Sequence, residues 1–150
     1  MEHSIKEEPL QILEFKGQGF AALLSSNGWR VGILRFSEGE EGGRIARMER
    51  HLETDEVFVL TKGRAILLLG GSAPEVEVAN PHLMDPGKIY NVRRLAWHAA
   101  ILSRDASILI VESDNTGSHN SEYAMLSAEM QNRISAAARR EGFPSLGSSG

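Results

Sequence analysis

Short apolar runs, many of them alternating with polar residues, follow each other closely along most of the chain. A period of two predicts β-strands, because successive side chains of a strand point to opposite faces. We predict strands over residues 10–15, 20–24, 29–36, 45–52, 57–60, 64–69, 75–78, 88–92, 97–102 and 107–112. Turns are expected at Asn27-Gly28, at Asn80-Pro81 and over residues 85–87, and a polar loop over 115–121. This spacing of short strands predicts an all-β sandwich or barrel.

The last part of the chain has a different pattern, with apolar positions spaced for one face of a helix. This stretch covers residues 127–140, and Ser127 is suited to cap its start. We therefore expect a barrel over residues 1–126, a C-terminal α-helix packed on the barrel over 127–141, and a disordered tail over 142–150.

The composition is that of an ordinary single-domain globular protein, with 150 residues, 41% of them hydrophobic and 24% charged. A net charge of −4 without a long basic run argues against nucleic acid as a partner. The chain has no cysteine, which excludes disulfides and thiolate metal sites. The longest apolar run, Ala65 to Leu69, is far shorter than the ~20 residues of a membrane helix, and the polar N-terminus does not resemble a signal peptide. We expect a cytoplasmic protein that does not bind membranes.

One histidine and two glutamates form the first part of a candidate site. Glu49 and His51 are two residues apart and share a face of the strand at 45–52, and Glu56 starts the next apolar run. If the two strands pair as neighbours, the three side chains converge on one interior position. Charged groups inside a sheet are costly without a partner, and a divalent metal ion or an arginine such as Arg47 would serve.

His98 is the other histidine on an expected strand, since the remaining three lie in polar, turn-rich stretches. A metal site would therefore draw on His51, His98, Glu56 and Glu49. Two imidazoles with one or two carboxylates suit Mn, Fe, Ni, Co or Zn. The alternative is that the histidines are structural residues at strand ends and that Glu49 pairs with Arg47.

The spacing from His51 through Glu56 to Gly63 resembles the first motif of the cupin superfamily, and His98 falls where the second cupin motif carries its histidine. The resemblance implies an RmlC-like jelly-roll fold, a small β-barrel, often with a bound divalent metal. Three positions depart from the family pattern. Glu49 stands where the first motif has a histidine, and Arg93 and Leu95 stand where the second has proline and glycine.

A narrower resemblance is to ureidoglycolate lyase-like cupins, which split ureidoglycolate into glyoxylate and urea. It rests on residues 48–51 with Phe58, and on residues 91–98. Glu56 departs from that family, which tends to carry glutamine at this position.

These features lead to the hypothesis of a metal-dependent lyase or isomerase acting on a small hydroxy, keto or ureido acid. The metal would act as a Lewis acid, and Glu49 or Glu56, if not a ligand, would move a proton as general base. Arg47, Arg93 and Tyr90 are the candidates for binding the acidic substrate, since guanidinium pairs with carboxylate. A packing role is the alternative for Tyr90.

Two rival hypotheses remain open. In the first, the barrel is a non-catalytic module that binds a small metabolite, with its charged residues in an internal salt-bridge network and no metal. In the second, the protein is purely structural, which polar residues inside a sheet argue against. A homodimer is expected in each case, because pairing covers the exposed edge strands of a small barrel.

Overall fold

Ten strands and one α-helix form the part of the chain that the computed structural model describes, residues 8–38 and 45–143. The strands are β1 (Gly19–Ser26), β2 (Trp29–Arg35), β3 (Arg47–His51), β4 (Glu56–Lys62), β5 (Ala65–Leu69), β6 (Asn80–Leu83), β7 (Tyr90–Val92), β8 (His98–Leu102), β9 (Ser107–Ser113) and β10 (Ser121–Met125). A short 3-10 helix, η2 (Ser118–Asn120), precedes β10, and α1 (Ala128–Arg140) follows it.

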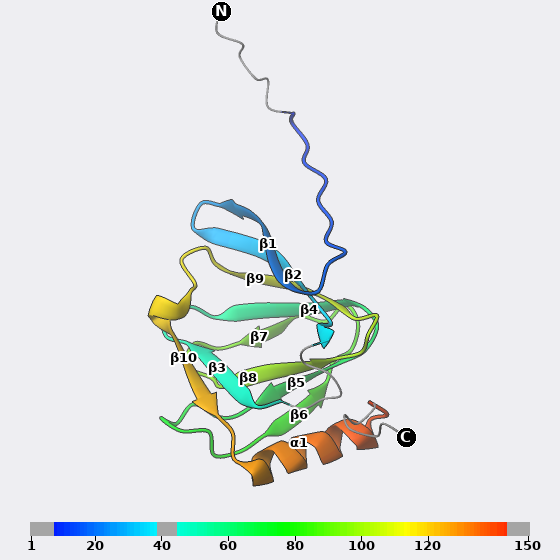
Figure 1. Cartoon of the computed structure of the whole chain (residues 1–150). Coiled ribbons are helices and arrows are strands. Elements are labelled where there is room, and N and C mark those ends of the chain that lie inside the picture. Colours follow the sequence, from blue (N-terminus) through cyan, green and yellow to red (C-terminus); the bar gives the residue numbers. More distant parts are fainter. Residues whose placement is uncertain (1–7, 39–44, 144–150) are drawn as a thin grey trace, which may run out of the picture.

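The strands form two five-stranded antiparallel sheets. The first sheet has the order β1-β2-β9-β4-β7, and the second has the order β10-β3-β8-β5-β6. In Figure 1, α1 lies along the second sheet, on the side away from β1 and β2. The described residues therefore form a two-sheet barrel with one helix on its outer surface, which confirms the predicted all-β jelly roll with a C-terminal helix.

The central part of the second sheet is buried on both faces, whereas its edge strand β6 is exposed. The inner face of this sheet contributes Leu67 to a core between the sheets, together with Phe58 and Ile108 of the first sheet. Its outer face contributes Ile66 and Leu68 to a second core. This explains why β5 reads Ala-Ile-Leu-Leu-Leu without alternation, since a strand covered on both faces has no polar side.

The helix α1 covers the second core. Ser127 accepts a hydrogen bond from the backbone N–H of Met130 and so caps the first turn, as predicted. Ile134 and Ala138 are 1% exposed and pack in the core, and Phe143 beyond the helix joins them at 4% exposed. Phe143 thus packs on the barrel, although it falls in the range expected to be a disordered tail; residues 144–150 of that range lie outside the described part.

Several sequence predictions of single elements were wrong. Residues 10–15 are rich in apolar side chains and residues 75–78 alternate in polarity, but neither segment forms a strand. Pro81 lies inside β6 rather than in a turn, which proline tolerates because β6 is an edge strand. β10 was missed, because its sequence Ser-Glu-Tyr-Ala-Met does not alternate between polar and apolar residues, and its strand pairing with β3 is long-range.

The predicted pairing of the strands that carry Glu49, His51 and Glu56 was also wrong. β3 belongs to the second sheet and β4 to the first, and no pairing joins them. The turn between them crosses from one sheet to the other. The three side chains meet because the inner faces of the two sheets oppose each other across the barrel.

No helix in the described ranges is both long enough and apolar enough to cross a membrane.

Replacing Ile134 by alanine should lower the free energy of unfolding by about 2–5 kcal/mol, because it leaves a cavity under α1. Arg133→Ala is the matched control, since Arg133 is exposed and pairs with Glu129 one turn away, and it should cost about 0.5 kcal/mol or less. Urea denaturation followed by circular dichroism measures both. Equal effects of the two substitutions would show that the helix does not pack on the sheet.

Candidate functional site

A cavity of about 230 Å³ lies between the two sheets. Phe20 and Tyr123 line it and are 42% and 49% exposed, so the cavity opens to solvent on their side. Its polar wall includes two histidines and three glutamates, from four different strands. These are Glu49, His51, Glu56, His98 and Glu112.

The second sheet supplies both histidines. Glu49 of β3 lies directly opposite His98 of β8, and residues opposed in this way point to the same face. His51 lies two residues after Glu49 and shares that face. The rings of His51 and His98 are 5.3 Å apart, centroid to centroid, and the two residues are 6% and 3% exposed.

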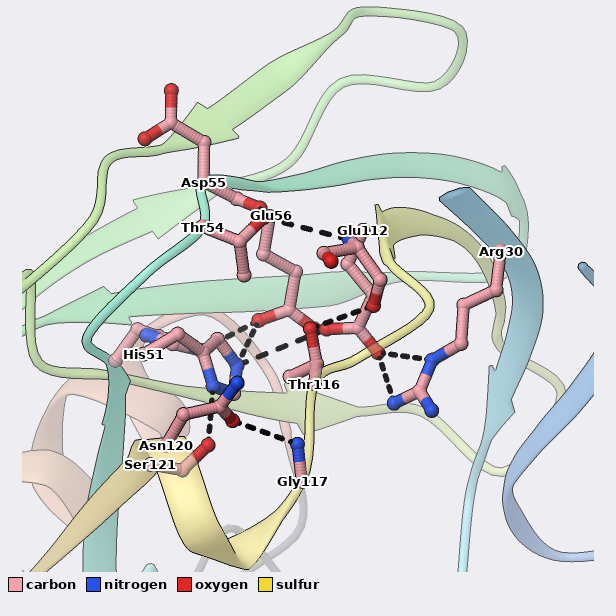
Figure 2. A network of polar contacts seen from close by, with 12 residues as sticks. Arg30, His51, Thr54, Asp55, Glu56, Glu112, Thr116, Gly117, Asn120 and Ser121 are labelled. Carbon is pink, nitrogen blue, oxygen red and sulfur yellow. Dashed lines mark hydrogen bonds and ion pairs between the residues drawn. The ribbon is translucent and has the colours of Figure 1, made fainter. Parts of the chain in front are cut away.

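The first sheet supplies the opposing charges. Arg30 of β2 lies opposite Glu112 of β9. Val57 of β4 lies opposite Val111 of β9, which puts Glu56 beside Glu112. Arg30, Glu112 and Glu56 thus form a row across three neighbouring strands, and Figure 2 shows Glu112 between Arg30 and the histidine side of the cavity.

Glu56 is the centre of the site. A single oxygen of its carboxylate, Oε2, is 2.9 Å from Nε2 of His51 and 2.9 Å from Nε2 of His98. Burial alone would raise the pKa of Glu56, but the hydrogen bonds to the two histidines outweigh burial and lower the pKa to about 2. Burial alone would lower the pKa of each histidine. The hydrogen bond to Glu56 and its negative charge outweigh burial, so the pKa values of His51 and His98 are both raised.

The other ring nitrogens of the histidines are fixed by hydrogen bonds. Nδ1 of His98 is 2.9 Å from the carbonyl oxygen of Ala96, which can only accept, so this nitrogen carries a proton. Nδ1 of His51 is 2.8 Å from the hydroxyl of Ser121 on β10. In a neutral His98, the lone pair is therefore on Nε2 and points into the cavity.

Glu112 is a site residue that the sequence interpretation missed. Oε1 of its carboxylate accepts hydrogen bonds from Nε and Nη2 of Arg30, at 3.0 and 2.6 Å. Its other oxygen, Oε2, is 3.9 Å from Nε2 of His51. Burial and the negative charge of Glu56 raise the pKa of Glu112. They outweigh the hydrogen bond to Arg30 and its positive charge, which lower it. The sequence did contain a sign of this role. Glu112 follows Ile108 and Ile110 at every second position of β9, so it is a charged residue on the otherwise apolar buried face of that strand.

The loop between β9 and β10 closes one side of the cavity. Asn120, 5% exposed, holds it together: its amide oxygen accepts from the N–H of Gly117, and its amide nitrogen donates to Glu53 and to the carbonyl of Asn115. The loop therefore brings the hydroxyl of Ser121 within hydrogen-bond distance of His51 and places Thr116 in the cavity wall (Figure 2). The sequence pattern had given this segment no role.

The three residues predicted to bind substrate are not brought to the cavity. Arg47 is exposed and stacks on the ring of Tyr123, 4.7 Å from its centroid. Tyr90 accepts a hydrogen bond from the backbone N–H of Asp85 and packs against the inner core. Arg93 is exposed and does not line the cavity. The geometry gives no support to their predicted role, and Arg30 is the one cationic residue among the described residues of the wall.

Leu95 occupies the position at which the cupin pattern has glycine. Its φ is +72°, in the left-handed region that glycine adopts without strain. Its backbone N–H donates to the carbonyl of His51, 2.9 Å away, which ties the loop before β8 to the end of β3. The glycine-like turn is therefore preserved with a leucine in it, at a cost of about 1–2 kcal/mol.

Comparison with solved structures identifies the architecture. Pac13 of Streptomyces, described as a nucleoside dehydratase with a β-barrel, matches with a TM-score of 0.52 and 9% identity over 77% of this chain and 86% of that one. A cupin-2 domain protein of Shewanella frigidimarina has a TM-score of 0.49 and 16% identity, over 66% and 84% of the two chains. An RmlC-like cupin of Methanocaldococcus jannaschii has a TM-score of 0.48 and 17% identity, over 71% of this chain and 92% of that one.

The chain has the cupin jelly-roll fold. At these identities the likeness concerns the fold alone. No protein-family model matches the sequence, and the comparison with curated proteins gives no match either. The narrower resemblance to ureidoglycolate lyase-like cupins finds no support among these structures and stays a prediction.

The cupin fold raises the question of a metal, and the donor atoms present fit one. Glu49, His51 and His98 each offer a ligand atom, and these atoms lie within 4.8 Å of one another; the same holds for His51, Glu56 and Glu112. The Nδ1 contacts of both histidines leave Nε2 facing the cavity, an outer-shell arrangement typical of metal-ligating histidines. Imidazole and carboxylate donors together suit the divalent transition metals predicted from the sequence.

Substituting Asn120 by alanine should destabilise the protein by about 1–3 kcal/mol, because the change removes a buried amide and leaves its partners unpaired. His119→Ala is the control on the neighbouring exposed residue and should be close to neutral. Thermal and urea denaturation measure the difference. A neutral Asn120→Ala variant would contradict the structural role given to this amide.

Proposed function

We propose that this cupin binds one divalent transition metal ion through His51, His98, Glu56 and Glu49, and that it is a lyase or isomerase acting on a small hydroxy, keto or ureido acid. The observation that carries the proposal is the convergence of both histidine Nε2 atoms on one carboxylate oxygen in a buried cavity. A bound metal would supply Lewis-acid polarisation of a substrate oxygen.

The charges of the wall support a divalent cation. Three carboxylates and one guanidinium line the cavity, which leaves two negative charges when both imidazoles are neutral. A buried excess of this kind is costly, and a divalent ion neutralises it. Glu49 adds to this support, since it makes no hydrogen bond or ion pair with any described residue and Arg47 turns to Tyr123 instead.

The size of the cavity supports a small substrate. Its volume of about 230 Å³ is below the roughly 300–1,000 Å³ typical of pockets for drug-sized ligands. Glu112 lies on the wall facing the histidines and could take or return a proton of the substrate. Arg30, beside Glu112, is placed to attract the carboxylate of an acid. A cytoplasmic location and a homodimer remain predictions that accompany this proposal.

The rival proposal is a metal-free cupin that binds a small metabolite without catalysis. One observation favours it: among the described residues, every buried side-chain nitrogen and oxygen has a hydrogen-bond partner. In that case both histidines would be imidazolium ions held by Glu56, in keeping with their raised pKa values. Metal content separates the two proposals.

Protein purified without a histidine tag should contain close to one equivalent of metal after loading with Mn, Fe, Co, Ni or Zn, as measured by elemental analysis. His51→Ala and His98→Ala should each lose it, because each removes an imidazole donor. His82→Ala is the control, since His82 is exposed on the edge strand β6 and outside the cavity.

Metal retained in both site variants, or absent from the loaded parent, would contradict the metal site. With metal bound, lyase and isomerase assays on small 2-hydroxy and ureido acids then test the reaction. No turnover of any of them, with metal present, would leave a metal-binding cupin and reject the proposed substrate class.

Glu49→Gln should weaken metal binding by at least about tenfold, because the amide is a poorer donor and removes a negative charge. Arg47→Gln, on the same strand, should leave the affinity unchanged, since Arg47 points away to Tyr123. Isothermal titration with Mn²⁺ measures both affinities. Equal affinities of the Glu49→Gln variant and the parent would show that Glu49 is not a ligand.

A further inference from the structure

The site contains one more carboxylate than the proposed metal site uses. Glu112 is buried, and with His51 and Glu56 it forms a group whose donor atoms lie within 4.8 Å of one another. Geometrically it is a candidate ligand. A carboxylate this close to the other donor atoms would join them in coordinating a divalent cation unless something held it back.

Arg30 provides that restraint. Its guanidinium contacts Oε1 of Glu112 through two nitrogen atoms, Nε and Nη2. The two residues are cross-strand partners on β2 and β9, so the pair is built into the register of the first sheet. The ring of Phe20 lies 5.6 Å from the guanidinium carbon and packs on its face. A guanidinium fixed by packing and by a forked contact is a rigid partner for a carboxylate.

The distances show the effect of this restraint. Oε2 of Glu56, which contacts no arginine among the described residues, is 2.9 Å from Nε2 of His51, whereas Oε2 of Glu112 is 3.9 Å from the same atom. The two glutamates lie on neighbouring strands at adjacent positions. The glutamate that Arg30 contacts is thus the one whose carboxylate lies farther from His51.

We propose that Arg30 is a positioning residue that holds Glu112 away from the metal, so that the metal keeps an open position facing Glu112 for substrate. This inference rests on the proposed metal site. Without Arg30, Glu112 would turn toward the histidines and occupy that position as an additional ligand. The metal would then be bound more tightly and would be less open to other ligands.

Cobalt(II) is the probe, because its visible absorption changes with the number of ligands. The parent, Arg30→Gln, Glu112→Gln and the double variant are each titrated with Co²⁺ alone. We expect Arg30→Gln to lower the Kd for Co²⁺ by roughly tenfold, a size that outer-shell residues commonly exert. Its absorption should also weaken as the coordination number rises. Glu112→Gln and the double variant should both keep the spectrum of the parent.

Three results would overturn this inference while the metal site stands. The first is an Arg30→Gln spectrum and Kd equal to those of the parent. The second is a change in Arg30→Gln that persists in the double variant, which would trace it to the lost positive charge. The third is a Glu112→Gln variant with an altered spectrum and weaker binding, which would show that Glu112 already coordinates in the parent. A parent that binds no Co²⁺ would reject the metal site and this inference together.

Arg30→Gln leaves a buried carboxylate without its partner and can fail to fold. Glu112→Gln, which keeps Arg30, then tests whether Glu112 is a ligand in the parent, and an altered spectrum with weaker binding would overturn the inference. Arg30→Lys adds a second check, since lysine keeps the charge but cannot make the forked contact. It should show a spectrum between those of the parent and a fully coordinated site, and a spectrum equal to that of the parent would contradict the restraint.

Discussion

The site depends on one arrangement, a buried carboxylate that faces two buried imidazoles. Glu56, His51 and His98 are each at most 6% exposed, and none of them could be buried in charged form alone. Glu56 supplies a negative charge, and each histidine supplies a ring nitrogen that contacts its carboxylate. The barrel tolerates these groups in its interior only because they meet at one point, where a divalent ion can replace the shared protons.

The jelly roll brings this about through two opposed sheets. The histidines come from β3 and β8 of the second sheet, and Glu56 comes from β4 of the first. The turn from β3 to β4 crosses between the sheets, so two residues close in sequence face each other across the cavity. α1 closes the outer face of the second sheet, and the loop before β10 orients His51 through Ser121. The fold thus holds both the donor atoms and the contacts that orient them.

The sequence predicted most strands and four of the five histidine and glutamate residues that line the cavity on the two facing sheets, because strand alternation and the cupin spacing are both local patterns. It failed where long-range pairing decides the outcome. Residues 75–78 alternate but pair with no strand of the described residues, whereas β10 does not alternate and becomes a strand by pairing with β3. Arg30 and Glu112 are 82 residues apart, and only the register of β2 with β9 shows that they are partners. Arg47 and Arg93 looked suitable by charge, but both lie outside the cavity.

Anomalous diffraction from crystals loaded with Zn²⁺ or Mn²⁺, recorded at the absorption edge of the metal, tests the metal site most directly. A single strong peak should lie about 2.0–2.2 Å from Nε2 of both His51 and His98, within reach of Glu56. Absence of a peak there, with Glu56 still hydrogen-bonded to both histidines in the loaded crystal, would contradict the metal site and favour the metal-free binding cupin.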